Sequence, residues 1–158
     1  MEKPGVTLTR NHSEKAKLVT WDDCIKKIDN EFKTKTIKIG IADAKEWKCP
    51  IMILHNENLP KTIFDSVEEL KEKGYIIQTC HVYTSFCSDC VTFGRHKDKV
   101  DVLITQAVGS VSYKFDDESI HRLEPGDSLF IPKGVYHDPY PHSPRITLST
   151  AILNYEQQ

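Results

Sequence analysis

The sequence lacks an excess of charge of either sign. Its 21 lysines and arginines are balanced by 23 aspartates and glutamates, which leaves a formal net charge of −2 over 158 residues. Such a chain offers no overall electrostatic attraction to nucleic acids or to anionic membranes. We therefore expect a small or neutral partner and a single site, because a chain of this length builds one core.

The sequence also lacks a long apolar run. No stretch approaches the roughly 20 apolar residues that cross a bilayer, and the polar opening MEKPGVTLTRNHSEK has no apolar segment of the kind found in signal peptides. The five cysteines are an odd number, which argues against a framework of disulfides. We expect a cytoplasmic protein with reduced thiols and no membrane association.

The first helical pattern follows a polar segment. Residues 1–18 contain proline and glycine and show no apolar period, so we predict a flexible N-terminal arm. Thr20 and Asp23 then form a capping pattern, and apolar residues recur at helical spacing over 21–32. This pattern predicts a short amphipathic helix.

A second helix and two strands are predicted before residue 75. Ser66 and Glu69 have the spacing of a capping box, and Gly74 is placed to end the helix that they would open. The segments TIKIGI (36–41) and CPIMIL (49–54) have the alternation or the length of strands.

The pattern changes at residue 75, where short β-rich runs begin to alternate with turns. The runs are YIIQTCHVYTSF, DVLITQAVGSVSYKF, IHRL, SLFIP and RITLSTAIL. They predict an antiparallel barrel with the helices packed on its outside. We predict one domain over 19–158, with the helices in 19–74 and the barrel core in 75–152.

Three residues are candidate metal ligands. His96 and Asp98 stand two apart, and in an extended strand this spacing points both side chains to one face. An imidazole and a carboxylate supply two members of a facial triad, which leaves metal positions open. The segment GDSLFIPKGVYH has the form of a turn, a strand and a turn, and it delivers His137 as the third ligand. The alternative is a barrel without metal that uses these polar groups to bind a small ligand.

These segments resemble known motifs. The spacing Gly-x5-Pro-x-Gly-x2-His is similar to the second cupin motif, and FGRHKDKVDVLITQAVGSVSY resembles the HxD segment of JmjC-type oxygenases. With HVY, LEPGDSLFIPKGVYH and TLST, residues 75–152 resemble the ribosomal-oxygenase-like members of the cupin Fe(II)/2-oxoglutarate oxygenase superfamily.

The resemblance implies a fold, cofactors and a reaction. The fold is mainly β, a double-stranded β-helix (cupin or jelly-roll) barrel, and the cofactors are Fe(II) on His96, Asp98 and His137 together with 2-oxoglutarate. The reaction is hydroxylation or demethylation of a small molecule or a peptide. Dimers are common among cupins, so a homodimer is the assembly that the resemblance suggests.

One position departs from the family pattern. The family usually has a lysine or arginine about fifteen residues after the first histidine to hold the far carboxylate of 2-oxoglutarate, and this chain has Val111 there. Arg145 instead resembles the arginine of an Arg-x-Ser pattern in the broader superfamily. Thr147 and Ser149 share its face of a strand, where a buried arginine needs an anionic partner. We predict Arg145 as the anchor, assisted by Ser149, Tyr83 and Thr147.

Other residues have weaker signals. His81 lies on a strand that can face the interior, and Tyr113 can line the pocket or fill the core, so both are candidates for supporting the site. Cys87 and Cys90 have the CxxC spacing of zinc or redox sites, but no second CxxC follows. We interpret these two cysteines as incidental loop thiols.

Three functions are consistent with the sequence. The leading hypothesis is an Fe(II)- and 2-oxoglutarate-dependent dioxygenase. The second is a metal-dependent cupin oxygenase or isomerase that does not use 2-oxoglutarate, which Val111 favours and Arg145 opposes. The third is a non-catalytic, ligand-binding cupin.

Overall fold

The computed structural model describes residues 5–34, 51–54 and 59–153. This part of the chain forms strands and helices in the following order: β1 (Thr7–Thr9), η1 (a 3-10 helix, Ala16–Leu18), α1 (Trp21–Thr34), β2 (Ile51–Leu54), α2 (Lys61–Glu72), β3 (Ile77–Ser85), β4 (Asp101–Val108), β5 (Val111–Phe115), β6 (Ile120–Leu123), β7 (Ser128–Ile131), β8 (His137–Pro141) and β9 (Arg145–Ile152).

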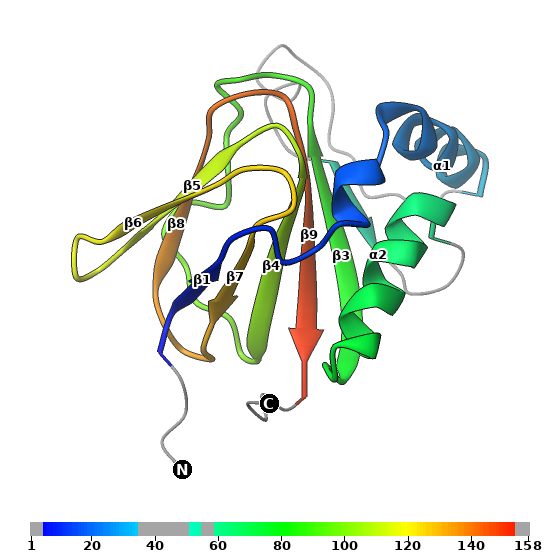
Figure 1. The fold of residues 1–158 in the computed structure, drawn as a ribbon. Coiled ribbons are helices and arrows are strands. Elements are labelled where there is room, and N and C mark those ends of the chain that lie inside the picture. Colours follow the sequence, from blue (N-terminus) through cyan, green and yellow to red (C-terminus); the bar gives the residue numbers. More distant parts are fainter. Residues whose placement is uncertain (1–4, 35–50, 55–58, 154–158) are drawn as a thin grey trace.

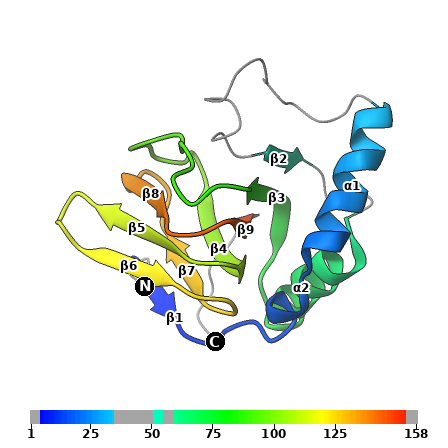
Figure 2. The ribbon, with the colours of Figure 1, turned by 90° about the horizontal axis from the view of Figure 1, so that it is seen from above.

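The strands form two antiparallel sheets. The larger sheet has the order β1-β7-β4-β9-β3-β2, and the smaller has the order β6-β5-β8. The two sheets face each other, and α1 and α2 lie beside β3 (Figure 1). Figure 2 shows the smaller sheet on one side of the larger sheet and both helices on the other. The arrangement is a jelly roll, or double-stranded β-helix, with helices outside it, which confirms the predicted fold class.

The larger sheet is buried on both faces. On its helix side, Val82 and Leu148 pack in one apolar cluster with Ile63 of α2 and Cys24 of α1. On the opposite side, residues of β4 and β7 pack in a second cluster with β5 and β6 of the smaller sheet. Because successive side chains of a strand point to opposite faces, the same sheet can contribute to both clusters, and β4 does so with Ala107 in the first cluster and Val102 and Ile104 in the second. The interior between the sheets is therefore a separate environment from the layer beneath the helices.

The second helix begins earlier than predicted. It starts at Lys61, directly after Pro60, and Ser66 lies in its middle, where the Ser66 hydroxyl donates to the carbonyl of Thr62 at 2.9 Å. The prediction that Ser66 opens the helix is thus wrong, because a serine inside a helix can satisfy its hydroxyl on the preceding turn. The predicted end is confirmed: Gly74 has a φ of +92°, the left-handed conformation of a helix C-terminus.

The first helix and the early strands can also be compared with the elements that the sequence predicted. The helix α1 begins after Thr20, whose hydroxyl accepts the amide of Asp23 at 3.3 Å, so the predicted cap is confirmed. The strand predicted in 49–54 is present as β2. The strand predicted in 36–41 lies outside the described residues.

The N-terminal segment differs from the flexible arm predicted over 1–18. β1 pairs antiparallel with β7, and Leu8 packs against the interior cluster. Ser13 is buried, and its hydroxyl donates to Glu69 of α2 at 2.5 Å. The sequence pattern missed this segment because an edge strand is held largely by backbone hydrogen bonds, which polar residues make as well as apolar ones.

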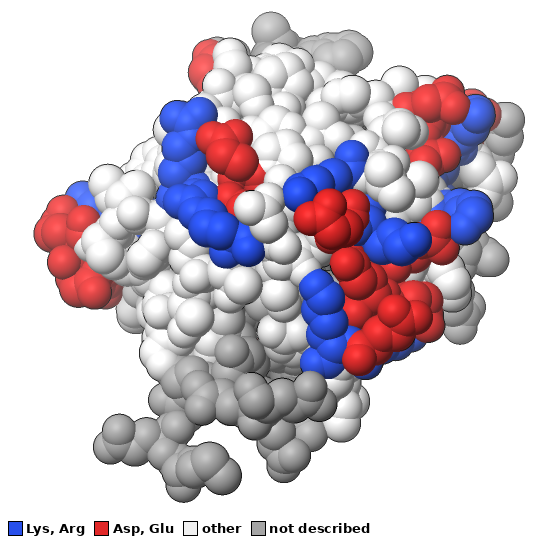
Figure 3. Space-filling model, in the orientation of Figure 1, with Lys and Arg blue, Asp and Glu red and all other residues white. Residues whose placement is uncertain are grey.

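The surface carries charges of both signs. On the face shown in Figure 3, acidic and basic groups lie next to one another in small clusters. The ion pairs of the described residues include Arg10 with Asp127 and Lys73 with Glu69. Among the described residues, no helix is long and apolar enough to cross a membrane.

Two glycines allow a test of the packing around the turn between β4 and β5. Gly109 and Gly134 have φ values of +71° and +83°, but a Cβ on Gly109 would lie 2.1 Å from the carbonyl oxygen of Pro144, whereas one on Gly134 would meet nothing within 4 Å. We expect Gly134→Ala to lower the free energy of unfolding by about 1 kcal/mol, and Gly109→Ala to lower it by roughly 3 kcal/mol. Urea unfolding measures both, and equal losses would contradict the close approach.

Candidate metal centre

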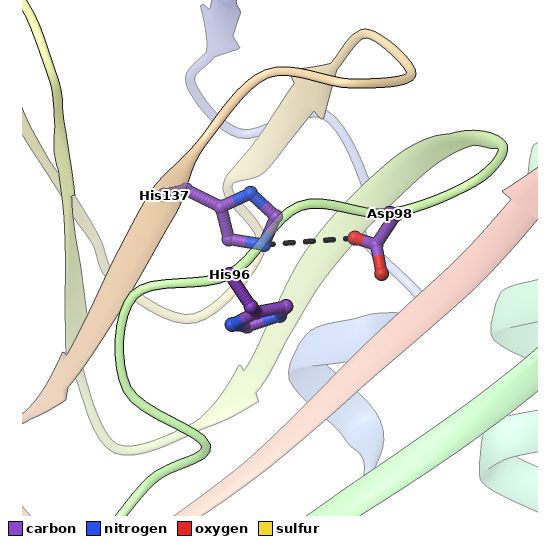
Figure 4. Close-up of side chains that lie close together, drawn as sticks. All are labelled: His96, Asp98 and His137. Atoms are coloured by element: carbon purple, nitrogen blue, oxygen red, sulfur yellow. Dashed lines mark ion pairs between the residues drawn. The ribbon is translucent and has the colours of Figure 1, made fainter.

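Three polar side chains converge in the interior between the sheets. One possible ligand atom from each of His96, Asp98 and His137 lies within 4.8 Å of the others. His137 Nε2 is 3.6 Å from Asp98 Oδ2, and the two imidazole ring centroids are 4.4 Å apart (Figure 4). The structure thus brings together the three residues that the sequence singled out, in a ligand set of two imidazoles and one carboxylate.

The backbone places these side chains from two directions. His137 is the first residue of β8, and His96 forms one isolated antiparallel bridge with it. The amide of Gly134 donates to the carbonyl of Asp98 at 3.0 Å, which ties Asp98 to the turn before β8. The sequence predicted a strand through His96 and Asp98; the structure has only this single bridge, yet both side chains reach the same point.

Both histidines present Nε2 as a free ligand atom. His96 Nδ1 lies 2.7 Å from the carbonyl of Gly94, and His137 Nδ1 lies 3.1 Å from the carbonyl of Val135. A carbonyl only accepts, so each Nδ1 carries the proton and each Nε2 keeps its lone pair. Metal-binding histidines are oriented by hydrogen bonds of this kind. The residues present therefore fit a divalent metal ion.

Burial keeps His137 neutral. Its side chain is 3% exposed. Burial is the main cause that lowers the pKa of His137. The hydrogen bond to the Val135 carbonyl opposes it, the neighbouring His96 lowers the pKa further, and Asp98 has a smaller raising effect. A neutral imidazole is the form that binds metals.

The triad opens onto a cavity whose empty volume is about 450 Å³, including the space at its opening to solvent. Of the residues predicted to contact the cosubstrate, Tyr83, Arg145 and Ser149 line the cavity, whereas Thr147 does not. Tyr113 also lines it. The complete lining is Tyr83, Thr92, Phe93, His96, Asp98, Ile104, Tyr113, His137, Pro139, Arg145 and Ser149.

Arg145 is a buried cation with an unsatisfied donor. Its side chain is held by Thr147, whose Oγ1 accepts Nη1 at 3.0 Å and donates to Gln106 Oε1 at 2.7 Å. The residue is 3% exposed, and its Nε has no hydrogen-bond partner. Arg145 forms no ion pair with any residue in the described ranges. A buried charge of this kind is costly unless an anion accompanies it, so the cavity favours an anionic ligand.

Thr147 therefore has a different place from the one predicted. Thr147 faces the interior as expected. It accepts a hydrogen bond from Arg145 and does not line the cavity. Gln106, which the sequence analysis missed, also donates to the carbonyls of Val108 and Gly109 at 2.7 and 3.1 Å. The sequence feature that could have indicated Gln106 is its single amide side chain within the apolar run DVLITQAV, because a buried polar group needs hydrogen-bond partners.

Two tyrosines beside the triad remain protonated at neutral pH. Burial, aided by Asp98 and Tyr113, raises the pKa of Tyr83 to about 12. Burial also raises the pKa of Tyr113, although Arg145 acts in the opposite direction. Both phenols can therefore donate a hydrogen bond to an anion in the cavity.

The remaining candidates lie away from the ligand atoms. Val111 is fully buried in the apolar cluster between the sheets, so no cation stands at the position where the family pattern has one. His81 is half-buried, pairs with Ser149 across β3 and β9, and contacts Tyr83 edge to face, with ring centroids 6.4 Å apart. It is thus a neighbour of the lining and not part of it.

The four cysteines that the structure describes are thiols and do not line the cavity. Cys87 and Cys90 lie in the loop between β3 and His96. Burial raises the pKa of the Cys24 and Cys80 thiols to about 12, which makes them poor nucleophiles and poor metal ligands.

Comparison with known proteins shows similarity in structure. No protein-family model and no curated protein match the sequence. A ribosomal oxygenase from Escherichia coli, YcfD, solved with cobalt and 2-oxoglutarate, matches with a TM-score of 0.56 at 21% identity over 68% of this chain and 32% of that one. The same protein with cobalt and succinic acid matches with a TM-score of 0.56 at 20% identity. The likeness is one of fold.

The match covers only part of the oxygenase chains, and another solved structure is also similar. The chain spans about a third of the length of the ribosomal-oxygenase chains. A cupin superfamily protein from Desulfitobacterium hafniense is also similar, with 17% identity over 51% of this chain and 74% of that one and a TM-score of 0.43.

The buried imidazole of His137 predicts a loss of stability in acid. Because its pKa is lowered in the folded state, the unfolded chain binds the proton more readily. The stability contributed by neutral His137 is complete above the ordinary histidine pKa of about 6.5 and is lost as the pH falls below it. Urea unfolding of metal-free protein from about pH 8 to about pH 5 should show a steeper loss for wild type than for His137→Asn. Parallel curves would contradict this assignment.

Proposed function

We propose that the protein is an Fe(II)- and 2-oxoglutarate-dependent oxygenase that hydroxylates or demethylates a small molecule or a peptide. One observation carries the proposal: a triad of two histidines and one aspartate shares a cavity with a buried arginine whose Nε has no partner. The triad suits a metal with open positions, and the arginine suits a carboxylate.

His96, Asp98 and His137 would hold the iron. Three protein ligands on one side leave room for a bidentate cosubstrate and for oxygen, as in other facial triads. Bound Fe(II), with 2-oxoglutarate and O₂, would supply an oxidant for a substrate C–H bond. In the overall reaction, one oxygen atom enters the substrate and the other enters succinate, while the 1-carboxyl group of 2-oxoglutarate leaves as CO₂.

Arg145 would bind the far carboxylate of 2-oxoglutarate. Its side chain lines the cavity, and the hydrogen bonds through Thr147 to Gln106 hold the guanidinium in place. Tyr83 and Ser149 line the same cavity, and the protonated phenol and the hydroxyl can donate to the same anion. Together they would orient the cosubstrate and exclude water from around it.

The structural likeness supports the cosubstrate. The YcfD structures that share this fold hold cobalt with 2-oxoglutarate or with succinic acid. Cobalt commonly stands in for Fe(II), because first-row divalent metals share ligands and differ in affinity. Cytoplasmic location, a homodimer and the absence of a nucleic-acid partner stay predictions from the sequence.

A second candidate is favoured by Val111. This residue is apolar and buried where the family pattern has a cation. A metal-dependent cupin oxygenase or isomerase that binds its substrate directly would need no anchor for 2-oxoglutarate. Release of succinate from 2-oxoglutarate separates the two candidates, because only the first consumes the oxoacid.

The cosubstrate assignment predicts the effect of one substitution. We expect wild-type protein with Fe(II) and O₂ to release succinate slowly even without substrate. Arg145→Gln should raise the KM for 2-oxoglutarate roughly 10- to 100-fold, the cost of losing a charged hydrogen-bond donor, while its Co(II) affinity stays at the wild-type value.

Arg122→Gln serves as the matched control. Arg122 is a surface arginine paired with Glu124, and its loss should leave the KM unchanged. No succinate from iron-loaded wild-type protein would rule out the 2-oxoglutarate reaction and favour the second candidate.

A further inference from the structure

His96 is held by very little regular structure. The segment 86–100 contains no strand, and His96 makes one isolated bridge to His137, with amide-to-carbonyl distances of 2.9 and 2.8 Å in the two directions. By contrast, the other edge of β8 pairs with β5 through five residue pairs. One bridge fixes a backbone only loosely, so other contacts must set the position of this ligand.

The residues on either side of His96 supply such contacts. In extended backbone, neighbours point to opposite faces, so Arg95 and Lys97 point outward when His96 points inward. The same alternation turns Tyr136 outward beside His137. Arg95 Cζ lies 3.8 Å from the centroid of the Tyr136 ring, and Lys97 Nζ lies 4.9 Å from it. Both cations are within the range of cation–π attraction.

Arg95 also forms a fork with Asp116, the residue after β5. Its Nε and Nη2 donate to Oδ1 and Oδ2 at 2.8 and 2.7 Å. Only a guanidinium can stack flat on a ring and bind a carboxylate through two parallel bonds at once. An isolated exposed ion pair contributes little. Here the stacking and the fork converge on a single side chain, and three segments are joined.

We propose that Arg95, Tyr136 and Asp116 form an outer clamp that positions His96 opposite His137 for metal binding. The inference rests on the proposed metal site, and it assigns to these residues a positioning role, not contact with the reacting atoms. The clamp lies on the outer face of the same backbone bridge whose inner face carries both imidazoles, so loosening it would widen the distance between the two ligands.

The test is Co(II) affinity, measured by visible absorption. Arg95→Lys keeps the charge but loses the fork, and Tyr136→Leu loses the ring; each should weaken Co(II) binding about tenfold, a typical cost for outer-shell partners. Tyr136→Phe keeps the ring and should bind like wild type. Arg122→Lys is the matched control: Arg122 and Glu124 are 56% and 51% exposed, as Arg95 and Asp116 are 53% and 55% exposed.

A second readout needs no metal. In metal-free protein, hydrogen exchange of the His96 amide should be several-fold faster in Arg95→Lys than in wild type, with the midpoint of urea unfolding unchanged. Wild-type Co(II) affinity in Arg95→Lys and Tyr136→Leu, or an equal loss in Arg122→Lys, would overturn the clamp. Absence of Co(II) binding by wild type would count against the proposed function, and unchanged amide exchange would then refute the clamp separately.

Discussion

Strand β9 faces two environments, because successive side chains of a strand point to opposite faces of the sheet. Ile146 and Leu148 are fully buried in the cluster beneath the helices. Arg145 and Ser149 point the other way, into the cavity. The same constraint turns His96 and His137 inward while their neighbours face solvent. Without two covered faces, the larger sheet could not combine a stable apolar layer with a polar site.

The polar site depends on how the hydrogen-bond donors of the buried Arg145 are satisfied. A guanidinium withdrawn from water is unfavourable unless its donors are satisfied. Thr147 and Gln106 satisfy one donor through a buried chain of hydrogen bonds, and the buried Nε has no hydrogen-bond partner. The protein thus carries an incomplete hydrogen-bond network that an anion would complete.

The sequence was most informative where a side-chain pattern has one structural cause. The alternation of β-rich runs indicated the barrel, and the spacings around His96 and His137 indicated all three side chains of the triad, His96, Asp98 and His137. Patterns with several causes failed. Ser66 has the spacing of a cap yet lies inside a helix, and β1 is held by backbone pairing that its polar residues do not reveal. Gln106 needed the tertiary structure, because its partners come from another strand and from the following turn.

The central claim is that His96, Asp98 and His137 form one metal centre. Its most direct test is the metal content of protein loaded anaerobically with Fe(II) and freed of excess ion. The account predicts close to a single iron per chain in wild type and in the double variant Cys87→Ser/Cys90→Ser, and almost none in Asp98→Ala or His137→Ala. Iron retained in the aspartate and histidine variants, or lost with the two cysteines, would contradict it.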